Sequence, residues 1–509
     1  MNAISRRTFV RGAGAAGLLL TAPEIWVQPA VAGTPDPEQI HLQFGTDASR
    51  GVSVSWATPI SVLHPRVNLS LVDGGSGRVV AADTRPYTDA KSGLEIITHH
   101  ALLTDLEPAT SYTYSVEHDG SSLQYGSFTT APVGRAAFRF TSFGDQATPE
   151  AGNGLASPWA AYNPPQVEAM RPLFHLLNGD LCYANISPNR PKTWRDFFIE
   201  NEVSTRYRPW MPAAGNHENE VGNGPLGWRA YQTQFSLPDH GESDPTLRGM
   251  WYAFKAGGVQ VISLNNDDVC LQDGGDNYVR GYSDNAQQRW LERTLQQARD
   301  DLDTDWIVVV MHQVAMSSAH NFNGADLGIR QTWLPLFDKY AVDLVLTGHE
   351  HHFERTLAVR GTDSANTLRP KVADPNLNVV DTTRGTVHMI IGGGGTSAPS
   401  NQLLLDPARC EVITEIGDQP TASSGSPRPK RVPVKEVEEA TWAGTRDKTH
   451  SWGFASFDVD PGQPGGLTSI AVRVWDTAPS VTGTPTVFDQ FTLQRPRRDA
   501  SSQRIGAAG

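Results

Sequence analysis

Cysteine is scarce in this chain, which has three among 509 residues: Cys182, Cys270 and Cys410. Their spacing fits no zinc-binding pattern, and an odd number cannot all pair with one another, so at most one disulfide can form. Positive charge is also in short supply. The formal net charge of -13 disfavours a basic groove for nucleic acid, so no nucleic-acid partner is predicted. No apolar run after residue 32 is long enough to span a bilayer.

What the chain does have is enough apolar residues for a large core. With 39% hydrophobic residues it can fold as a globular protein, and its length exceeds that of one ordinary domain. Two domains are therefore expected.

The first 32 residues have the pattern of an export signal. Arg6 and Arg7 are followed by a weakly apolar stretch, 12–21, and Ala30-Val31-Ala32 supplies the small residues of a cleavage site. This pattern resembles a twin-arginine signal peptide. We therefore expect residues 1–32 to be removed after recognition by the twin-arginine export machinery. The mature protein would be secreted, periplasmic or in the cell envelope, with no transmembrane segment.

Residues 33–131 have the period-two alternation of an all-β domain. Alternating runs occur at 40–44, 52–56 and 67–71, separated by turn residues. Tyr112 enters a further alternating strand after Leu106-Glu107-Pro108, which resembles the tyrosine corner of a fibronectin type III-like β-sandwich, with Trp56 as a core residue. We predict such a sandwich over residues 33–131.

After a linker at 131–134, the pattern becomes that of an α/β domain, predicted over residues 135–496 with a mixed sheet. Short apolar runs alternate with amphipathic stretches such as the helix expected at 287–299. The runs are 138–143, 173–177, 259–264, 306–311, 342–346 and 387–391. A segment rich in proline and charge, 414–448, is expected as a surface insertion, the runs 454–459 and 469–474 as closing strands, and 497–509 as a disordered tail.

Metal-ligand residue types follow five of the apolar segments. In open α/β sheets, sites form outside the carboxyl ends of the strands, so segments far apart in the chain can converge there. Two carboxylates, three imidazoles, one amide and one phenol suit a pair of metal ions, and one carboxylate could bridge them. The seven candidate ligands are Asp145, Asp180, Tyr183, Asn216, His312, His349 and His351.

The short sequence blocks that contain the candidate ligands, taken in their order along the chain, resemble the signature of the metallophosphoesterases and, more narrowly, of the purple acid phosphatases. The tyrosine three residues after Asp180 is the narrow discriminator. The preceding β domain also resembles the larger members of that family. The blocks are Gly144-Asp145, Gly179-Asp180-Leu181-Cys182-Tyr183, Gly215-Asn216-His217-Glu218, His312 after Val309, and Gly348-His349-Glu350-His351.

The resemblance assigns roles to the matching residues. It implies that Asp145, Tyr183 and His351 hold an iron(III) ion. It implies that Asn216, His312 and His349 hold a divalent ion (Fe, Zn or Mn), that Asp180 bridges the two, and that His217 and His320 act on substrate. Two departures bear on this: the first block continues Gln146-Ala147 where the family commonly has Leu-Gly, and tandem histidines common after His312 reduce to His320.

The expected activity is that of an acid phosphatase, a phosphoric monoester hydrolase. Two cations would neutralise charge on the phosphoryl group and supply a metal-bound hydroxide as nucleophile, yielding an alcohol and inorganic phosphate. The alternatives are an exported phosphodiesterase or nucleotide-hydrolysing metallophosphoesterase, a twin-arginine-exported alkaline phosphatase with a similar leading β domain, and a non-enzymatic envelope-binding β-sandwich protein.

Overall fold

The structure is a computed structural model that describes residues 35–499, apart from 73, 75–76, 151, 273, 422–429 and 479–482. The predicted signal peptide, residues 1–32, therefore lies outside the described residues. Within the described part of the chain, no helix combines the length and the apolar character that crossing a membrane requires.

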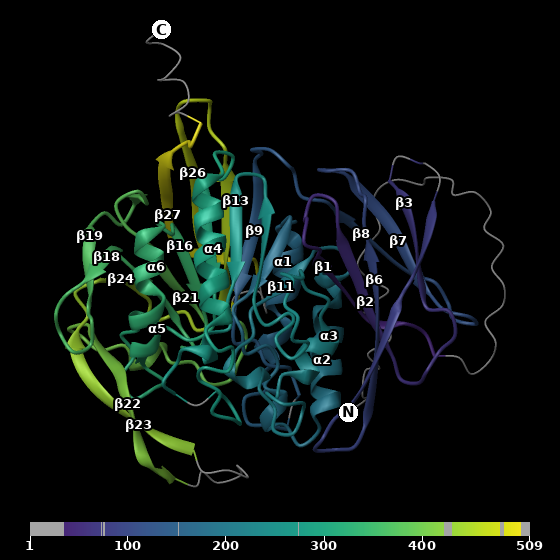
Figure 1. Cartoon of the computed structure of the whole chain (residues 1–509), viewed down its shortest axis with the longest axis horizontal. Helices are drawn as coiled ribbons and strands as arrows, with labels where there is room; N and C mark the ends of the chain where they lie inside the picture. Colours follow the sequence, from purple (N-terminus) through teal and green to yellow (C-terminus); the bar gives the residue numbers. More distant parts are fainter. Residues whose placement is uncertain are drawn as a thin grey trace.

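The N-terminal domain is all-β, as predicted, with two four-stranded antiparallel sheets (Figure 1). One sheet has the order β1-β2-β6-β5 and the other β4-β3-β7-β8. Trp56 is fully buried, and the Tyr112 hydroxyl accepts a hydrogen bond from the Glu107 backbone N–H at 2.9 Å, which is the bond expected of a tyrosine corner. The strands are β1 (Glu38–Phe44), β2 (Val52–Thr58), β3 (Arg66–Leu71), β4 (Arg78–Ala81), β5 (Asp83–Thr88), β6 (Glu95–Leu103), β7 (Ser111–Glu117) and β8 (Gln124–Thr129).

The second domain contains two seven-stranded mixed sheets. The first has the order β11-β10-β9-β25-β26-β27-β20, and the second β12-β13-β14-β16-β21-β17-β24. The first consists of β9 (Phe138–Phe143), β10 (Phe174–Leu177), β11 (Trp210–Pro212), β20 (Val379–Asp381), β25 (Gly453–Asp460), β26 (Leu467–Asp476) and β27 (Thr486–Pro496). The second consists of β12 (Tyr252–Ala256), β13 (Val259–Ser263), β14 (Trp306–Val310), β16 (Leu344–Thr347), β17 (Phe353–Thr356), β21 (Val387–Ile391) and β24 (Ala443–Arg446).

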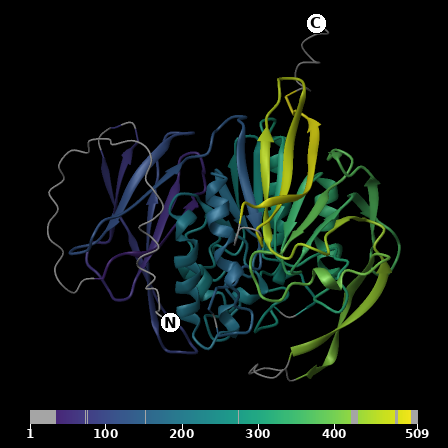
Figure 2. The ribbon, with the colours of Figure 1, turned by 180° about the vertical axis from the view of Figure 1, so that it is seen from behind.

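The predicted apolar runs form strands in both sheets, and β14 shows why such a run has no polar face. In β14, Val308 and Val310 pack into the core between the sheets, while Ile307 and Val309 pack into a second core beneath helix α4 (Ala286–Asp300). A strand covered on both faces has no polar face to alternate with, which explains the run Trp306–Val310. Figure 2 shows the sheet containing β25 to β27 on the reverse side of the molecule.

The remaining helices cover the outer faces and the boundary between the domains (Figure 1). They are α1 (Asn163–Ala169), α2 (Arg190–Thr205), α3 (Arg229–Gln234), α5 (Leu327–Thr332) and α6 (Leu334–Lys339). The sandwich packs tightly against α2 and α3. The His41 ring stacks on Phe198 at 4.2 Å, and the Tyr114 hydroxyl donates to the Arg206 carbonyl at 2.8 Å. Apolar residues of both domains belong to one continuous core.

Two expectations about surface segments differ from the structure. The region predicted as an insertion carries part of a long hairpin, β22 (Arg409–Thr421) and β23 (Lys430–Glu439), which pairs with β15 (Ala325–Asp326). The predicted tail begins too early, because the Arg497 guanidinium donates to the Gly462 carbonyl and the Arg498 backbone N–H to Asp305 Oδ1, each at 2.8 Å. The rest of the tail lies outside the described residues. A short pair, β18 (Ala358–Thr362) and β19 (Pro370–Asp374), completes the fold, and all three cysteines are free and buried.

Candidate metal centre

The seven predicted ligands lie in loops that follow parallel strands. β9, β10 and β11 are parallel in one sheet, and β14 and β16 are parallel in the other. Each ends two to four residues before a candidate ligand, so both sheets direct their carboxyl edges to one place. The ligand-bearing loops follow Phe143, Leu177, Pro212, Val310 and Thr347.

Asp145, Tyr183 and His351 form one group of mutual contacts. The Tyr183 hydroxyl lies 3.2 Å from Asp145 Oδ1 and 3.1 Å from His351 Nε2. His351 Nε2 is 3.4 Å from Asp145 Oδ1. Three donor atoms of different chemical types thus surround a single point, as the resemblance implies for the iron(III) ligands.

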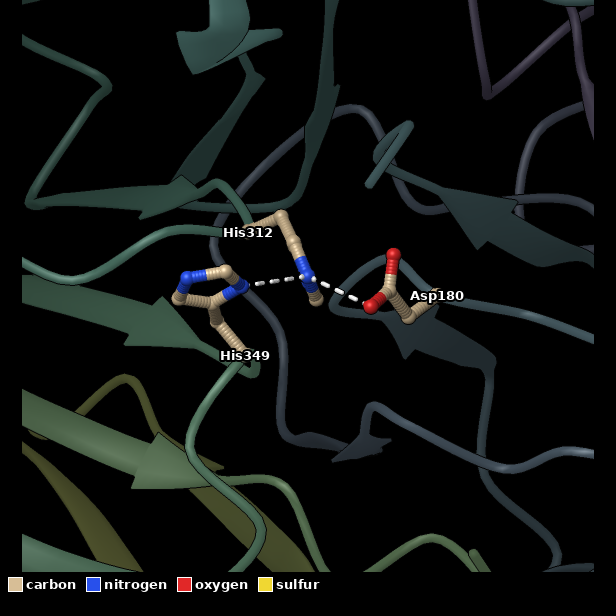
Figure 3. A group of neighbouring side chains, drawn as sticks. All are labelled: Asp180, His312 and His349. Carbon is tan, nitrogen blue, oxygen red and sulfur yellow. Dashed lines mark hydrogen bonds and ion pairs between the residues drawn. The ribbon is translucent and has the colours of Figure 1, made fainter. Parts of the chain in front are cut away.

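Asp180, His312 and His349 form a second group, shown in Figure 3. Their nearest ligand atoms all lie within 4.8 Å of one another. His312 Nε2 is 3.0 Å from Asp180 Oδ2 and 3.2 Å from His349 Nδ1. Three buried donors at this spacing could hold one metal ion.

The fourth predicted member, Asn216, carries an independent sign of a missing partner. Its side-chain Oδ1 is buried and has no hydrogen-bond partner among the described residues. An unpaired buried amide oxygen costs free energy, and a metal ion would satisfy it. The loop that contains Gly275 packs tightly against Asn216, since a Cβ on Gly275 would lie 1.9 Å from the Asn216 carbonyl oxygen.

Hydrogen bonds on the far side of each ring orient the three imidazoles. Nδ1 of His312 donates to the Asn178 carbonyl and Nδ1 of His351 to the Ala398 carbonyl, each at 2.7 Å. His349 uses its other nitrogen, Nε2, which lies 3.0 Å from Gln272 Oε1. Because Nδ1 of His312 and Nε2 of His349 carry the donated protons, the neutral rings face each other through the lone pairs of His312 Nε2 and His349 Nδ1. This arrangement requires a proton or a metal ion between the two nitrogens.

Four of the seven candidate ligands have left-handed backbone conformations, with φ of 58° at Asp145, 50° at Asp180, 56° at Tyr183 and 68° at His349. Each such residue costs about 1–3 kcal/mol, and clusters of them are typical of functional sites. The preceding glycines allow close approach, since a Cβ on Gly348 would lie 2.3 Å from Asp145 Oδ2, and Gly179 also adopts a positive φ of 81°. The backbone is therefore strained where it presents the ligands.

The pKa shifts at the candidate centre show where positive charge is needed. Burial opposes ionisation of Asp180, yet His312 and His217 hold its pKa below the ordinary value. Burial also opposes protonation of His312, but Asp180 and Asp145 raise its pKa to about 10. Burial together with Asp145 and Asp180 raises the pKa of Tyr183 well above that of a free tyrosine. A phenolate here therefore requires a strongly charged cation.

Two residues with a structural role at the centre were not assigned one from the sequence. Glu218 is buried, and its carboxylate accepts backbone hydrogen bonds at 2.8 to 2.9 Å from Gly215, Asp180 and Leu181. It thereby ties the loop of Asp180 to the loop of Asn216. Glu350 similarly accepts from the Gly324 N–H at 2.6 Å. Both residues lie within the motif blocks, which was the signal in the sequence that could have marked them. Their structural role could not be predicted, because their contacts join segments far apart in the chain.

His217, predicted to act on substrate, lies beside the centre. Its Nδ1 is 2.8 Å from Asn185 Oδ1, its Nε2 is 4.0 Å from Asp180 Oδ2, and its ring lies 4.7 Å from that of Tyr183. Its side chain is 18% exposed, whereas that of Asp180 is 3% exposed, so His217 lies nearer the solvent.

His320, the other predicted substrate residue, is placed differently. Its Nδ1 lies 2.6 Å from Glu411 Oε1 of the β22–β23 hairpin. Among the described residues, none of its side-chain contacts is with a candidate ligand. The loop just beyond it does reach the centre, because Phe322 packs edge-on against the His351 ring at 5.1 Å. His320 therefore lies at the junction of this loop with the hairpin.

Comparisons with known proteins match both domains. Residues 37–130 match the family described as "Purple acid Phosphatase, N-terminal domain", and residues 160–353 match "Calcineurin-like phosphoesterase". The Mycobacterium tuberculosis protein "Uncharacterized protein Rv2577" is 50% identical over 97% of this chain and 96% of its own length. The Arabidopsis thaliana protein "Fe(3+)-Zn(2+) purple acid phosphatase 12" is 27% identical over 72% of this chain and 73% of its own.

Solved structures share the fold. The purple acid phosphatase PPD1 of yellow lupin (Lupinus luteus) covers 92% of this chain, with 76% of its own length aligned, a TM-score of 0.64 and 20% identity. A structure of PhoD covers 93% of this chain and 92% of its own, with a TM-score of 0.56 and 12% identity. Fold, matched domains and relatives agree with the ordered motifs, and the chain belongs to the purple acid phosphatase family of metallophosphoesterases.

Proposed function

We propose that this protein hydrolyses phosphate monoesters to an alcohol and inorganic phosphate at a centre of two metal ions. The observation that carries the proposal is the arrangement of the predicted ligands in two adjacent contact groups, one around Tyr183 and one around His312. The Asn216 oxygen without a partner and the facing imidazoles of His312 and His349 both fit bound cations.

The donor sets support different ions in the two positions. Asp145, Tyr183 and His351 offer two oxygens that can ionise, which suits iron(III). Asn216, His312 and His349 are neutral when they bind a metal, which suits a divalent ion. Asp180 would contribute to both, as the resemblance implies: its Oδ2 lies 3.0 Å from His312 Nε2, and the Asp145 N–H donates to the carbonyl of the neighbouring Gly179 at 3.0 Å. The Arabidopsis relative carries Fe(3+) and Zn(2+) in its name.

When bound, the two ions would neutralise charge on the phosphoryl oxygens and make a hydroxide nucleophile available near neutral pH. The chain's own residues would do the rest. Asn185 fixes the His217 ring through Nδ1 and leaves Nε2 on the side of Asp180. The protonated ring could give its Nε2 proton to the leaving alkoxide as the bond from phosphorus to that oxygen breaks.

The test is a comparison of aryl phosphate monoesters and diesters on protein loaded with iron and zinc, with metal content measured on the same sample. We expect two metal ions per chain and faster hydrolysis of the monoester. Faster hydrolysis of the diester would favour the phosphodiesterase alternative. Two bound metals without any hydrolysis would contradict an enzymatic role.

We also propose export by the twin-arginine route, which rests on Arg6, Arg7 and the small residues ending at Ala32. That route carries folded proteins, which suits a metal centre assembled from loops of two sheets. Replacing both arginines by lysine should leave the precursor inside the cell. Unchanged export of that variant would show that another route is used.

A further inference from the structure

A cavity at the boundary of the two domains is lined by three arginines. Its volume is about 430 Å³, within the usual range of ligand-binding pockets. Arg85 comes from β5 of the sandwich, Arg229 begins α3 of the second domain, and Arg248 lies in the loop before β12. Figure 1 shows α3 beside the sandwich strands.

The guanidinium groups lack the partners that arginines usually have in this molecule. Nη1 of Arg85 reaches only the carbonyls of Gln232 and Phe235, each at 3.4 Å, and Nε of Arg248 donates to the Glu242 carbonyl at 3.2 Å. Within the described ranges, none of the three lies within 4.0 Å of a carboxylate oxygen. Arg330, which is fully buried, pairs with Glu438 at 2.9 Å, whereas Arg85 is half-buried and Arg229 and Arg248 are exposed where they line the cavity.

The charge in the cavity is unbalanced. One carboxylate, that of Asp239, lines it, and its Oδ1 already accepts the Gly241 N–H at 2.8 Å. Burial lowers the pKa of Arg85 below its ordinary value; the charge of Asp83 opposes this, and that of Arg229 lowers it further. An excess of positive charge is unusual in a chain whose formal net charge is -13.

We propose that this cavity binds a tetrahedral oxyanion, namely a phosphate group, between Arg85, Arg229 and Arg248. Guanidinium groups match the oxygens of phosphate with paired donors, and a bound anion would relieve the repulsion between them. The phosphate could be free or carried by a small organic molecule. None of the residues that line this cavity is a candidate metal ligand. In the titration that tests the cavity, the second phosphate site and product inhibition rest on the proposed function, whereas the effect of the arginine variants does not.

Isothermal titration of the metal-loaded protein tests this site, with inorganic phosphate and with phenylphosphonate at constant ionic strength. The double variant R229A/R248A replaces two exposed side chains and should fold normally. R289A/R293A is the matched control, because it removes the same charge from exposed positions on α4 outside this cavity.

We expect two phosphate sites in the wild type and in the control. The double variant should lose one of them, or bind there at least about tenfold more weakly, while product inhibition by phosphate at the metal centre stays unchanged. Binding of both probes would indicate a site open to organic phosphates, and binding of phosphate alone a site for the free ion. Equal site number and affinity in the double variant and the wild type would overturn the proposal.

Discussion

The two halves of the candidate metal centre are built alike but differ in their side-chain chemistry. Both are formed by loops after parallel strands, and in both a histidine is fixed by donating Nδ1 to a backbone carbonyl. The Tyr183 half, however, brings a carboxylate and a phenol beside one imidazole, whereas the His312 half brings two imidazoles beside the carboxylate of Asp180. The same scaffold can therefore hold ions of unequal charge, because side-chain chemistry alone distinguishes the two positions.

Asp180→Asn should break both halves at once and have the largest effect. Asp180 is the proposed bridge between the two ions and lies 3.0 Å from His312 Nε2, and the amide would remove its charge where the two ions repel each other most. Changes beyond the direct ligands already weaken metal binding by about 10–100-fold, so we expect a greater loss for both ions and no turnover. Metal analysis with a turnover assay checks this. Two metals and near-normal activity in the variant would refute a shared role.

Alanine at His349 and at His351 should separate the halves. The two residues lie on one loop, but each contacts a different group. We expect His349→Ala to lose the divalent ion and keep iron, and His351→Ala to lose iron, each with affinity reduced by more than about 100-fold. The metal content per chain, measured for each variant, tests which ion is lost. Loss of both ions in each variant would mean that the halves do not fill independently.

His217→Ala should leave both halves filled and slow the reaction. If His217 donates a proton to the leaving group, the rate should fall by about 10²–10⁴-fold while two metals remain bound. His320→Ala is the natural comparison. Because His320 pairs with Glu411 away from the ligands, we expect a smaller effect on rate. Loss of a metal in His217→Ala would place that residue among the ligands instead.

Tyr183→Phe should have the smallest effect on turnover among these variants, and it tests the Tyr183 half alone. Iron(III) bound by a phenolate would give a visible charge-transfer band, and phenylalanine removes the oxygen while preserving the ring that packs against His217. We expect the band to vanish and iron to bind more weakly. An absorption spectrum of the oxidised, iron-loaded protein tests this. A persistent band, or a colourless wild type that contains iron, would leave the phosphoesterase proposal with the other six ligands.

Local patterns predicted the elements that carry the centre. The run at 138–143 is β9, the helix expected at 287–299 is α4, and the motif residues lie at strand ends. These predictions succeed because the burial of a strand and the type of a candidate ligand can be recognised from short stretches of sequence. They also placed the ligands in one region, since parallel strands share a carboxyl edge.

Contacts between distant segments could not be predicted in this way. Glu218 bonding to Asp180, Gln272 orienting His349 and the left-handed backbone at Asp145 depend on segments far apart in the chain. The hairpin strand β23 was missed for a different reason, because Pro433 and the many charges of this exposed segment obscure a strand pattern.

The continuous core shared by the sandwich and the second domain has a consequence for how the chain unfolds. Phe44 and Trp56 of the sandwich belong to the same apolar cluster as Phe198 and Phe235 of the second domain, and His41 is buried between the two. Separating the domains would expose this surface to water, so their melting should be a single cooperative event. A truncated chain that begins at the linker would be expected to aggregate, which makes the sandwich a built-in requirement for solubility.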